Sequence, residues 1–524
     1  MTNNNMSRRA FIGRSAAAAA VAGMGAQPSH AASVRSRPNI LLLMTDQQRG
    51  DCLGCDGNDV ISTPNIDRIA AEGAHFRCAY SSTPTCTPAR SGLLTGLSPW
   101  HHGMLGYGRG ASSYPVELPR AMRDAGYQTL GIGKMHWYPQ RNLHGFHRTI
   151  LDESSRSETP GFLSDYRAWF AQNAPSGMEY NVTGIGWNDY RSKSYVPDEE
   201  LHPTRWTADR AIEFIGDYAG EEPFFLKVSF ARPHSPYDPP QRFMDAYRED
   251  NMPKRHIGDW CRRFAQGNPS NYTSWQGDFG EEQACRSRRG YYGSISFIDE
   301  QVGRILSTLD KRGMLDDTLI IFTADHGDMT GDHHLWRKSY PYESSARIPF
   351  IVRPPKGFSP VRGATFRHPV ELRDILPTCL DSAGVTMPGN LDGRSVLDIF
   401  RNEKAPWRDS IDLEHDVCYS PENHWNALTD GRYKYIYYAP TGEEQLFDLV
   451  DDPGEEHDLA RENGKKPLVR DWRGRMIGQL AERGEPFVVN GDLGIRKERM
   501  LYSPFYPDHE ARRLEGLMNR RNRD

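Results

Sequence analysis

Two acidic residues stand at the ends of buried apolar runs, and each is followed by another side chain that can bind a metal. Asp46 and Gln47 close the run PNILLLMTDQQ, and Asp325 and His326 close LIIFTADHG. In an open α/β sheet, ligands collect beyond the carboxyl ends of the strands, so these four side chains can converge on one point. Two carboxylates, an amide oxygen and an imidazole suit a divalent cation. Either acid alone could instead cap the loop after its strand, so the metal prediction depends on both together.

Four basic side chains occupy comparable positions. Lys134 and His136 end the segment GIGKMHW, where strand alternation would point both side chains the same way. His234 follows another apolar run in FARPHSPY, and Lys338 follows the Asp-His turn in LWRKSYPYE. A single histidine or lysine is usually a solvated surface group. Several cations around a metal, however, describe a site for a tetrahedral oxyanion, because each cation offsets charge that grows during group transfer.

Cys86 lies between two prolines in the segment PTCTPARSGLLTG, and its residue type permits several roles. It could be half of a disulfide, a metal ligand, a nucleophile or a packing residue. Thr85 and Thr87 with Pro88 predict the start of a helix here, so residue 86 would face the positive end of that helix. An anionic group is favoured at such an end.

Two motifs make the chain resemble the type I sulfatases of the alkaline-phosphatase-like superfamily. PTCTPARSGLLTG fits the C-x-P-x-R pattern of that family, and GYQTLGIGKMH fits its second pattern. The similarity extends from NILLLMTD to the aromatic segment GRYKYIYY near the C-terminus. The resemblance implies that Cys86 is oxidised to Cα-formylglycine by a formylglycine-generating (sulfatase-maturating) enzyme. The cysteine would then be a precursor and not a working thiol.

The same resemblance implies a set of metal ligands and a nucleophile. The ligands would be Asp46, Gln47, Asp325 and His326, together with an oxygen of the formylglycine hydrate at position 86. One hydroxyl of that hydrate would attack the sulfur of a sulfate ester, with the metal holding the oxygen and orienting the sulfate. The second hydroxyl explains the modification, since it allows the enzyme to expel sulfate and regenerate the aldehyde.

The basic residues receive roles from the resemblance as well. Arg90, one helical turn beyond Cys86, would support the hydrate. Lys134 and His234 would bind the sulfate oxygens, and Lys338 or His234 would protonate the leaving alcohol. His136 would then take the proton from the second hydroxyl. Dividing one difficult displacement into two easier steps is covalent catalysis.

The acidic motifs depart from the commonest family pattern. Many members have Asp-Asp where this chain has Asp46-Gln47, and Asp-Asn where it has Asp325-His326. The Asp-Gln and Asp-His combination occurs in some sulfatases, and also in the related phosphonate monoester hydrolases and phosphodiesterases. We expect calcium as the ion. Magnesium or manganese are alternatives, because the site has one fewer carboxylate and an imidazole ligand tolerates softer metals than calcium.

Three functions therefore compete. The first is a sulfatase that acts on a sulfated glycan or small sulfate ester, and the second is a phosphonate monoester or phosphodiester hydrolase. The third is a non-catalytic protein that binds sulfated glycans. Lys134 and His136 favour the sulfatase, because the phosphonate hydrolases use neutral hydroxyl groups in that region, and a binding protein needs neither Cys86 nor His136.

Alternating strands and helices must position these residues. Apolar runs at 38–46, 222–230 and 317–325 predict buried strands, and TPNIDRIAAEG predicts a helix that ends at Gly73. A longer helix before residue 317 is predicted by apolar residues at helical spacing, namely Ile295, Ile298, Val302, Ile305 and Leu309. This order predicts an α/β fold with a large, mainly parallel sheet covered on both faces.

After about residue 405 the sequence pattern changes. Aromatic and polar residues alternate around a Thr-Gly turn in NALTDGRYKYIYYAPTGEEQLFDL, which predicts an antiparallel hairpin. A helix is predicted over 465–483, followed by a basic tail. We therefore expect a catalytic domain over 33–405 and a smaller α+β domain with an antiparallel sheet over 406–524.

The N-terminus predicts export. Arg8-Arg9 precedes an Ala/Gly-rich run and small residues at Ala31 and Ala32, as in a twin-arginine signal over residues 1–32. The mature protein is then expected in the periplasm or outside the cell. An Ala-rich helix of the mature fold is the alternative.

The composition of the 524-residue chain excludes some partners. The net charge of −5, with both signs mixed, argues against nucleic-acid binding by phosphate neutralisation. The mature sequence has no apolar stretch long enough to predict an integral membrane segment. Eight scattered cysteines do not suggest a disulfide framework, although one or two disulfides are possible. The isolated CxxC at Cys52 and Cys55 lacks a second pair at zinc-site spacing.

Overall fold

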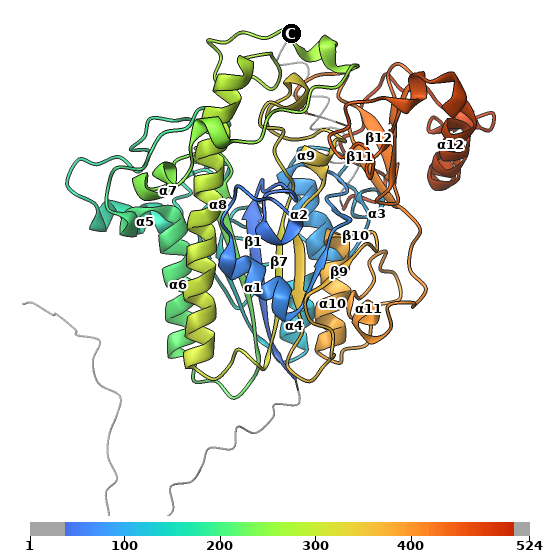
Figure 1. Cartoon of the computed structure of the whole chain (residues 1–524). Helices are drawn as coiled ribbons and strands as arrows, with labels where there is room; N and C mark the ends of the chain where they lie inside the picture. The colour runs from blue at the N-terminus through green and yellow to red at the C-terminus, as the bar shows by residue number, and fades with distance from the viewer. Residues whose placement is uncertain (1–36, 155, 417, 508–524) are drawn as a thin grey trace, which may run out of the picture. The chain divides into compact units, whose positions relative to one another are not determined.

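One large sheet forms the centre of the structure. The computed structural model describes residues 37–154, 156–416 and 418–507, so the expected signal over 1–32 and the tail from 508 lie outside the described residues. Within that described part, eight strands join this sheet: β1 (Asn39–Asp46), β2 (Ala74–Phe76), β4 (Gln128–Gly133), β5 (Arg148–Leu151), β6 (Phe224–Pro233), β7 (Thr318–Ala324), β8 (Phe350–Arg353) and β9 (Ala364–Phe366). Their order is β5-β4-β6-β1-β7-β8-β2-β9. Figure 1 labels the neighbouring strands β1 and β7 of this sheet.

The sheet is mainly parallel, as predicted. Every neighbouring pair from β5 to β7 is parallel, and β8 runs antiparallel to both β7 and β2. The three strands predicted from apolar runs are β6, β1 and β7, which lie next to one another near the middle of the sheet. Strands in this position are buried on both faces, which explains their nearly continuous apolar sequences.

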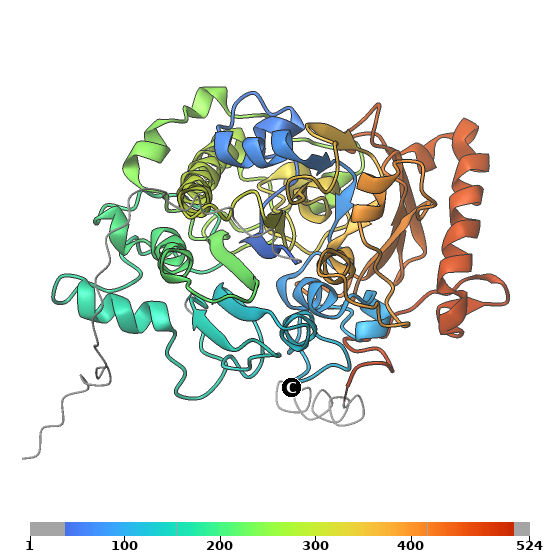
Figure 2. The ribbon, with the colours of Figure 1, turned by 90° about the horizontal axis from the view of Figure 1, so that it is seen from below.

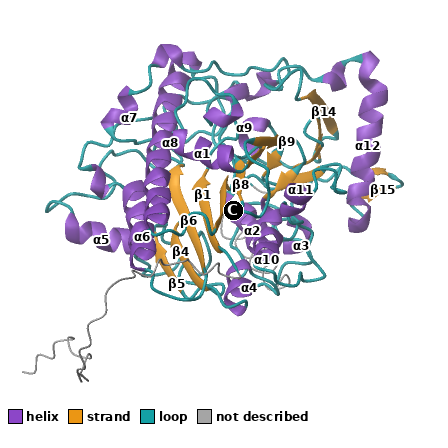
Figure 3. Ribbon diagram, turned by 60° about the horizontal axis from the view of Figure 1, so that its bottom comes forward, coloured by secondary structure: helices purple, strands orange, loops and turns teal. Residues whose placement is uncertain are grey.

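Alternate residues of β1 face two different layers of helices. Ile40, Leu42 and Met44 belong to one apolar core, and Leu41 and Leu43 belong to the other. The first core includes residues of α2 (Cys86–Thr95), α4 (Leu118–Asp124) and α10 (Ile375–Ser382). The second includes residues of α1 (Pro64–Glu72), α6 (Pro203–Asp217) and α8 (Gly280–Lys311). Figure 3 shows these two groups of helices on opposite sides of the sheet.

The predicted helices form where the periodicity placed them. In α8, all five apolar residues that predicted the helix are buried, and most of them pack in the second core. α1 begins at Pro64 and ends before Gly73. The remaining helices and strands are short, apart from α5: α3 (Pro99–His102), α5 (Asp165–Asn173), α7 (Gln241–Asp245), α9 (Glu343–Ala346), α11 (Leu397–Arg401), β3 (Ala79–Tyr80), β10 (Val370–Glu371), β15 (Val488–Val489) and β16 (Asp492–Leu493).

A second, antiparallel sheet forms in the C-terminal part. Its strands, in sheet order, are β11 (Ile411–His415), β12 (Trp425–Thr429), β13 (Tyr433–Tyr438) and β14 (Glu443–Asp448). The sequence predicted one hairpin around the Thr-Gly turn, which is β13–β14, and it predicted α12 (Lys466–Leu480), but it did not predict β11. Figure 2 shows α12 beyond this sheet, on the side away from α6 and α8. The described residues from 37 to 507 belong to one compact unit. The domain boundary near residue 405 stays a prediction.

The eight cysteines all lie in the described part and are free thiols. Among the described residues, no helix combines the length and the apolar character that crossing a membrane requires.

Candidate active site

Four neighbouring parallel strands deliver the predicted site residues at one edge of the sheet. Lys134 follows β4, His234 follows β6, Asp46 ends β1 and Asp325 follows β7. Each of these four side chains is completely buried. The carboxyl ends of parallel strands meet at one edge, so the strand order alone brings these charges together.

Arg90 joins the ends of these strands. From the middle of α2, its Nε donates to Asp325 Oδ2 at 2.9 Å and its Nη2 to Asp46 Oδ2 at 3.1 Å. Its Nη1 donates to the carbonyl of Lys134 at 2.5 Å and to the hydroxyl of Ser229 at 3.1 Å. A buried guanidinium that binds two carboxylates holds both in fixed orientations.

A cluster of potential metal ligands lies beside Arg90. The ligand atoms of Asp46, Cys86, Asp325 and His326 all lie within 4.8 Å of one another. Cys86 Sγ lies 3.1 Å from His326 Nε2 and 3.7 Å from Asp46 Oδ1. The other nitrogen, His326 Nδ1, lies 2.9 Å from the carbonyl of Gly327, which leaves the Nε2 lone pair directed at the cluster. Two carboxylates and one imidazole fit a divalent cation.

Cys86 is the first residue of α2, as the helix-start prediction requires. Thr85 precedes it in extended conformation, but its hydroxyl does not cap the helix and instead lies 2.8 Å from the hydroxyl of Ser339. Burial and the Asp46 carboxylate act to raise the pKa of the Cys86 thiol, yet Lys338 and other cations bring that pKa below its ordinary value. Position 86 is therefore a place that favours negative charge.

Gln47 lies next to the cluster and is held through both ends. Its backbone N–H donates to Asp325 Oδ1 at 2.9 Å, with a left-handed φ of 68°. Its side-chain Oε1 accepts from Lys338 Nζ at 2.7 Å, and its Nε2 donates to Asp328 Oδ2 at 2.5 Å. The amide oxygen of Gln47 therefore faces Lys338, one of the basic residues predicted from the sequence.

Lys134, His234 and Lys338 surround the cluster. Lys134 Nζ lies 2.5 Å from Asp46 Oδ2, and Lys338 Nζ lies 2.7 Å from His234 Nε2. The ring of Trp187 stacks on His234 at a centroid distance of 3.8 Å and lies 4.6 Å from Lys134 Nζ. Burial, with Lys338 and Lys134 adding to it, holds the pKa of His234 well below its usual range. The imidazole is therefore neutral.

His136 is positioned differently from the sequence argument. β4 ends at Gly133, so Lys134 and His136 follow the strand and alternation does not apply to them. His136 has a φ of 63°, and its backbone N–H donates to Glu153 Oε1 at 2.8 Å. Its ring, only 5% exposed, packs edge-on against Tyr107 at 6.1 Å. Within the described chain neither ring nitrogen has a hydrogen-bond partner.

The pKa of His136 lies well below its ordinary value. Burial is the main cause, and the positive charges of Arg156 and Lys134 add to it. A neutral, buried imidazole with no hydrogen-bond partner in the described structure can accept a proton.

Sequence reasoning missed three residues that hold the site. Asp328 binds the Gln47 amide, Trp187 covers His234 and Lys134, and Glu153 holds the backbone of His136. Asp328 could have been identified from the sequence, because it follows Asp325 in the same DHGD turn. Trp187 and Glu153 lie in loops whose sequences carry no periodic pattern.

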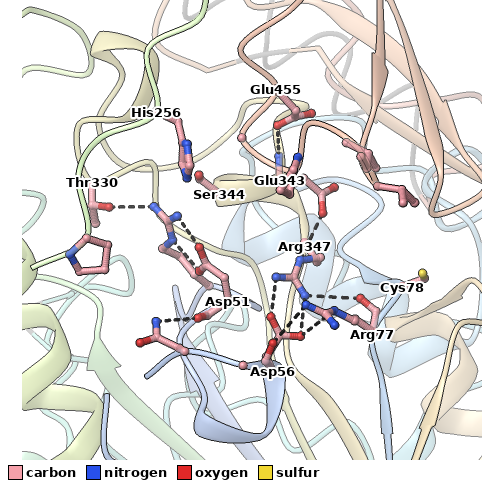
Figure 4. A pocket seen from close by; sticks show the side chains of 18 of the residues that line it. Asp51, Asp56, Arg77, Cys78, His256, Thr330, Glu343, Ser344, Arg347 and Glu455 are labelled. Carbon is pink, nitrogen blue, oxygen red and sulfur yellow. Dashed lines mark hydrogen bonds and ion pairs between the residues drawn. The ribbon is translucent and has the colours of Figure 1, made fainter. Parts of the chain in front are cut away.

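A cavity of about 490 Å³ lies elsewhere in the described structure (Figure 4). Its lining contains none of the predicted site residues. Many of the charges that face it are paired within the protein: Arg347 lies 2.9 Å from Asp56, and Arg49 lies 2.6 Å from Asp51.

Sequence comparison assigns the chain to a family. Residues 38–385 match the family described as Sulfatase, and residues 331–482 match the family described as N-sulphoglucosamine sulphohydrolase, C-terminal. An arylsulfatase of Clostridium perfringens is 38% identical over 470 residues, covering 87% of this chain and 97% of the relative. A choline-sulfatase of Rhizobium meliloti is 32% identical, covering 82% and 84%.

Structural comparison agrees on the fold. The crystal structure of a phosphonate monoester hydrolase of Agrobacterium radiobacter superposes with a TM-score of 0.72 and 24% identity, covering 88% of this chain and 100% of that one. This likeness concerns the fold alone. The family match over residues 38–385 and the two relatives above 30% identity show that the chain belongs to the sulfatase family, the sulfuric ester hydrolases of the alkaline-phosphatase-like superfamily.

Proposed function

We propose that the protein hydrolyses a sulfate ester of a carbohydrate or of an aryl or alkyl alcohol, releasing the alcohol and inorganic sulfate. The nucleophile would be the hydrate of a formylglycine made from Cys86. The observation that carries the proposal is the position of Cys86 at the start of α2, inside the cluster of Asp46, Asp325 and His326. The arylsulfatase and choline-sulfatase relatives support the choice of ester.

The chemistry of the donor set fits a divalent cation, and we propose calcium, with magnesium or manganese as alternatives. Asp46, Asp325, His326 and residue 86 would hold it, with the Gln47 amide oxygen as a further ligand. The ion would supply Lewis acidity, lowering the pKa of a hydrate hydroxyl and offsetting charge on the sulfate.

Lys134 and the neutral His234 would bind the sulfate oxygens. Lys134 Nζ lies 2.5 Å from Asp46 Oδ2, and the pKa of Asp46 stays well below its ordinary value because the charges of Lys134, Arg90 and Lys338 outweigh the effect of burial. The same positive charges would offset the charge that grows on the sulfate oxygens in the transition state. Arg90, bound to Asp46 and Asp325, would keep these carboxylates from rotating toward the substrate.

Two proton transfers complete the proposed reaction. The attacking hydroxyl of the hydrate would first lose its proton to water. When its oxygen then bonds to sulfur, the bond between sulfur and the ester oxygen breaks, and Lys338 or His234 gives a proton to the departing alcohol. His136 then takes the proton of the second hydroxyl, the bond between carbon and the sulfate oxygen breaks, and the aldehyde returns. The ring nitrogens of His136 have no hydrogen-bond partner among the described residues, so a lone pair is open to this proton. Burial and the nearby cations hold its pKa well below the ordinary value, which makes it a weak base in the absence of the negatively charged sulfate.

A phosphonate monoester or phosphodiester hydrolase is the second candidate, favoured by the superposition with the Agrobacterium enzyme. Lys134 and His136 argue for sulfate. The two functions are separated by comparing kcat/KM for aryl sulfates with kcat/KM for aryl phosphonates and phosphodiesters that share the same leaving group. The proposal expects sulfate to win by orders of magnitude, and a clear preference for phosphorus esters would refute it. A non-catalytic binding protein is disfavoured by family membership.

We also propose that residues 1–32 direct twin-arginine export, that the mature protein works in the periplasm or outside the cell, and that a sulfatase-maturating enzyme modifies Cys86. The support for export is Arg8-Arg9 with the Ala-rich run that follows, and the support for the modification is the motif PTCTPARSGLLTG around Cys86. Replacing both arginines with lysine should retain the protein in the cytoplasm, as cell fractionation would measure. Unchanged export would exclude the twin-arginine route.

A further inference from the structure

Asp328 contacts the predicted metal ligand Gln47 but belongs to neither the predicted ligand set nor the predicted catalytic set. It is completely buried in the turn that also carries Asp325 and His326. Its Oδ2 accepts from Gln47 Nε2 and from the hydroxyl of Tyr237, both at 2.5 Å. Its Oδ1 accepts the backbone N–H groups of Thr330 at 3.0 Å and Arg337 at 3.1 Å. Four donors therefore fix this carboxylate.

An amide side chain can be turned either way, and only its neighbours decide which end faces a metal. Gln47 lies between Asp328, whose carboxylate accepts from four donors, and the Lys338 ammonium, which can only donate. The NH₂ group must therefore face Asp328, and the oxygen must face Lys338. If the amide were flipped, its NH₂ group would face the Lys338 ammonium, donor against donor. Its oxygen would face the Asp328 carboxylate, acceptor against acceptor.

We propose that Asp328 is a positioning residue that orients the Gln47 amide so that its oxygen, and not its NH₂ group, is presented to the metal. The inference deepens the proposed function and rests on Gln47 as a ligand. Oε1 has a second lone pair besides the one that accepts from Lys338, and that pair is free to bind a cation. Residues that orient metal ligands in this way commonly affect metal affinity strongly.

The Asp328→Asn variant tests the orientation directly. Because two backbone N–H groups hold the Oδ1 side, the new NH₂ group must take the place of Oδ2 and face Gln47. The Gln47 amide must then turn its oxygen toward that NH₂ group, and its own NH₂ group toward the metal. We expect Ca²⁺ affinity, measured by isothermal titration calorimetry on chelator-stripped protein, to fall about 10- to 100-fold.

Adding Gln47→Glu to Asp328→Asn should restore much of the Ca²⁺ affinity that Asp328→Asn loses. Gln47→Glu alone places a carboxylate against Asp328, so it should also weaken Ca²⁺ binding. In the double variant, the glutamate can accept from the asparagine NH₂ group with one oxygen and present the other to Lys338 and the metal. The double variant should therefore bind Ca²⁺ more tightly than either single variant, within about tenfold of the wild type, which is a coupling that independent sites do not show.

Tyr237→Phe is the matched control, because it removes a hydroxyl from the same Oδ2 and leaves the acceptor that orients Gln47. It should weaken Ca²⁺ binding much less than Asp328→Asn. All variants are compared in one maturation state, checked by the mass of the peptide carrying residue 86, and with metal-free melting temperatures as the test of folding. The readout is binding, so loss of the sulfatase assignment would not affect it.

Three results would overturn the inference. One is wild-type Ca²⁺ affinity in Asp328→Asn. Another is a double variant whose Ca²⁺ affinity falls by the product of the two single-variant losses, as expected for independent sites. The third is a wild-type protein that binds no Ca²⁺, because an oriented amide would then have no ligand role.

Discussion

Lys338 Nζ lies 2.7 Å from His234 Nε2, and His234 Nδ1 lies 3.0 Å from the carbonyl of Ser235. A carbonyl can only accept, so Nδ1 carries the imidazole proton and Nε2 accepts from the lysine. Burial and the charge of Lys338 hold the pKa of His234 well below its usual range, in agreement with a neutral ring. The proton available within this pair therefore belongs to Lys338, and we propose Lys338 as the acid that protonates the leaving alcohol.

Replacing Lys338 with methionine should therefore lower kcat most for substrates with poor leaving groups. Alkyl sulfates need a proton on the departing oxygen, so their kcat should fall about 10²- to 10⁴-fold. For aryl sulfates whose leaving phenols are acidic, kcat should fall much less. Rates over a series of leaving groups measure this, with Lys356→Met as the control at a lysine that is 73% exposed. An equal loss for all leaving groups would contradict the assignment.

Replacing His136 with glutamine should separate the two chemical steps. The first step would still release the alcohol, but the second hydroxyl would keep its proton and sulfate would stay on the enzyme. Rapid mixing with an aryl sulfate should show a burst of about one phenol per active site, followed by slow turnover. Mass spectrometry should find sulfate on the peptide carrying residue 86. A slow reaction without a burst would place His136 in the first step or outside the chemistry.

Arg90→Lys should damage both stability and activity. A lysine cannot replace the bonds from Arg90 to Asp325, Asp46 and Ser229 together. Leaving buried carboxylates without their partner costs about 3–5 kcal/mol of unfolding free energy, which urea denaturation would measure. Arg68→Lys, at a half-exposed helix pair with Glu72, is the control. A loss below about 1 kcal/mol, as expected for a surface pair, would show that Arg90 does not hold the carboxylates.

Stability should depend on pH through Asp416. This carboxyl is 4% exposed and accepts the backbone N–H of Met500, and burial raises its pKa from 3.8 to about 7. Because the folded pKa is the higher one, the stabilising contribution is complete below pH 3.8 and is lost as the pH rises to about 7.

Asp416→Asn keeps an acceptor for Met500 and removes the titration. Between pH 3.8 and about 7, the wild type should lose stability relative to this variant by about 1.4 kcal/mol per pH unit. Urea denaturation at a series of pH values measures the difference. Asp451→Asn, at a carboxylate that is 76% exposed, is the control. A difference that does not change with pH would exclude an effect of Asp416.

The regular elements that position the site could be predicted from sequence, and the loop contacts could not. β1, β6 and β7 were visible as apolar runs, and α8 through its periodic residues, because a buried strand and a helix face impose patterns on the sequence. Parallel topology then implies that Asp46, His234 and Asp325 meet.

The contacts of Trp187, Glu153 and the Ser339 hydroxyl depend on loop conformations, which local sequence does not determine. Thr85 illustrates the limit, because its type predicts a cap while the fold pairs its hydroxyl with Ser339. The alternation expected for Lys134 and His136 failed for the same reason, since the strand ends at Gly133.

The central claim is that residue 86 acts as formylglycine in the working enzyme. It is tested by the mass of the peptide carrying residue 86, measured in protein that releases sulfate from an aryl sulfate at multiple turnovers. The account predicts the mass of formylglycine or its hydrate in the active fraction, with activity proportional to that fraction across preparations. An intact thiol at Cys86 in fully active protein would contradict it.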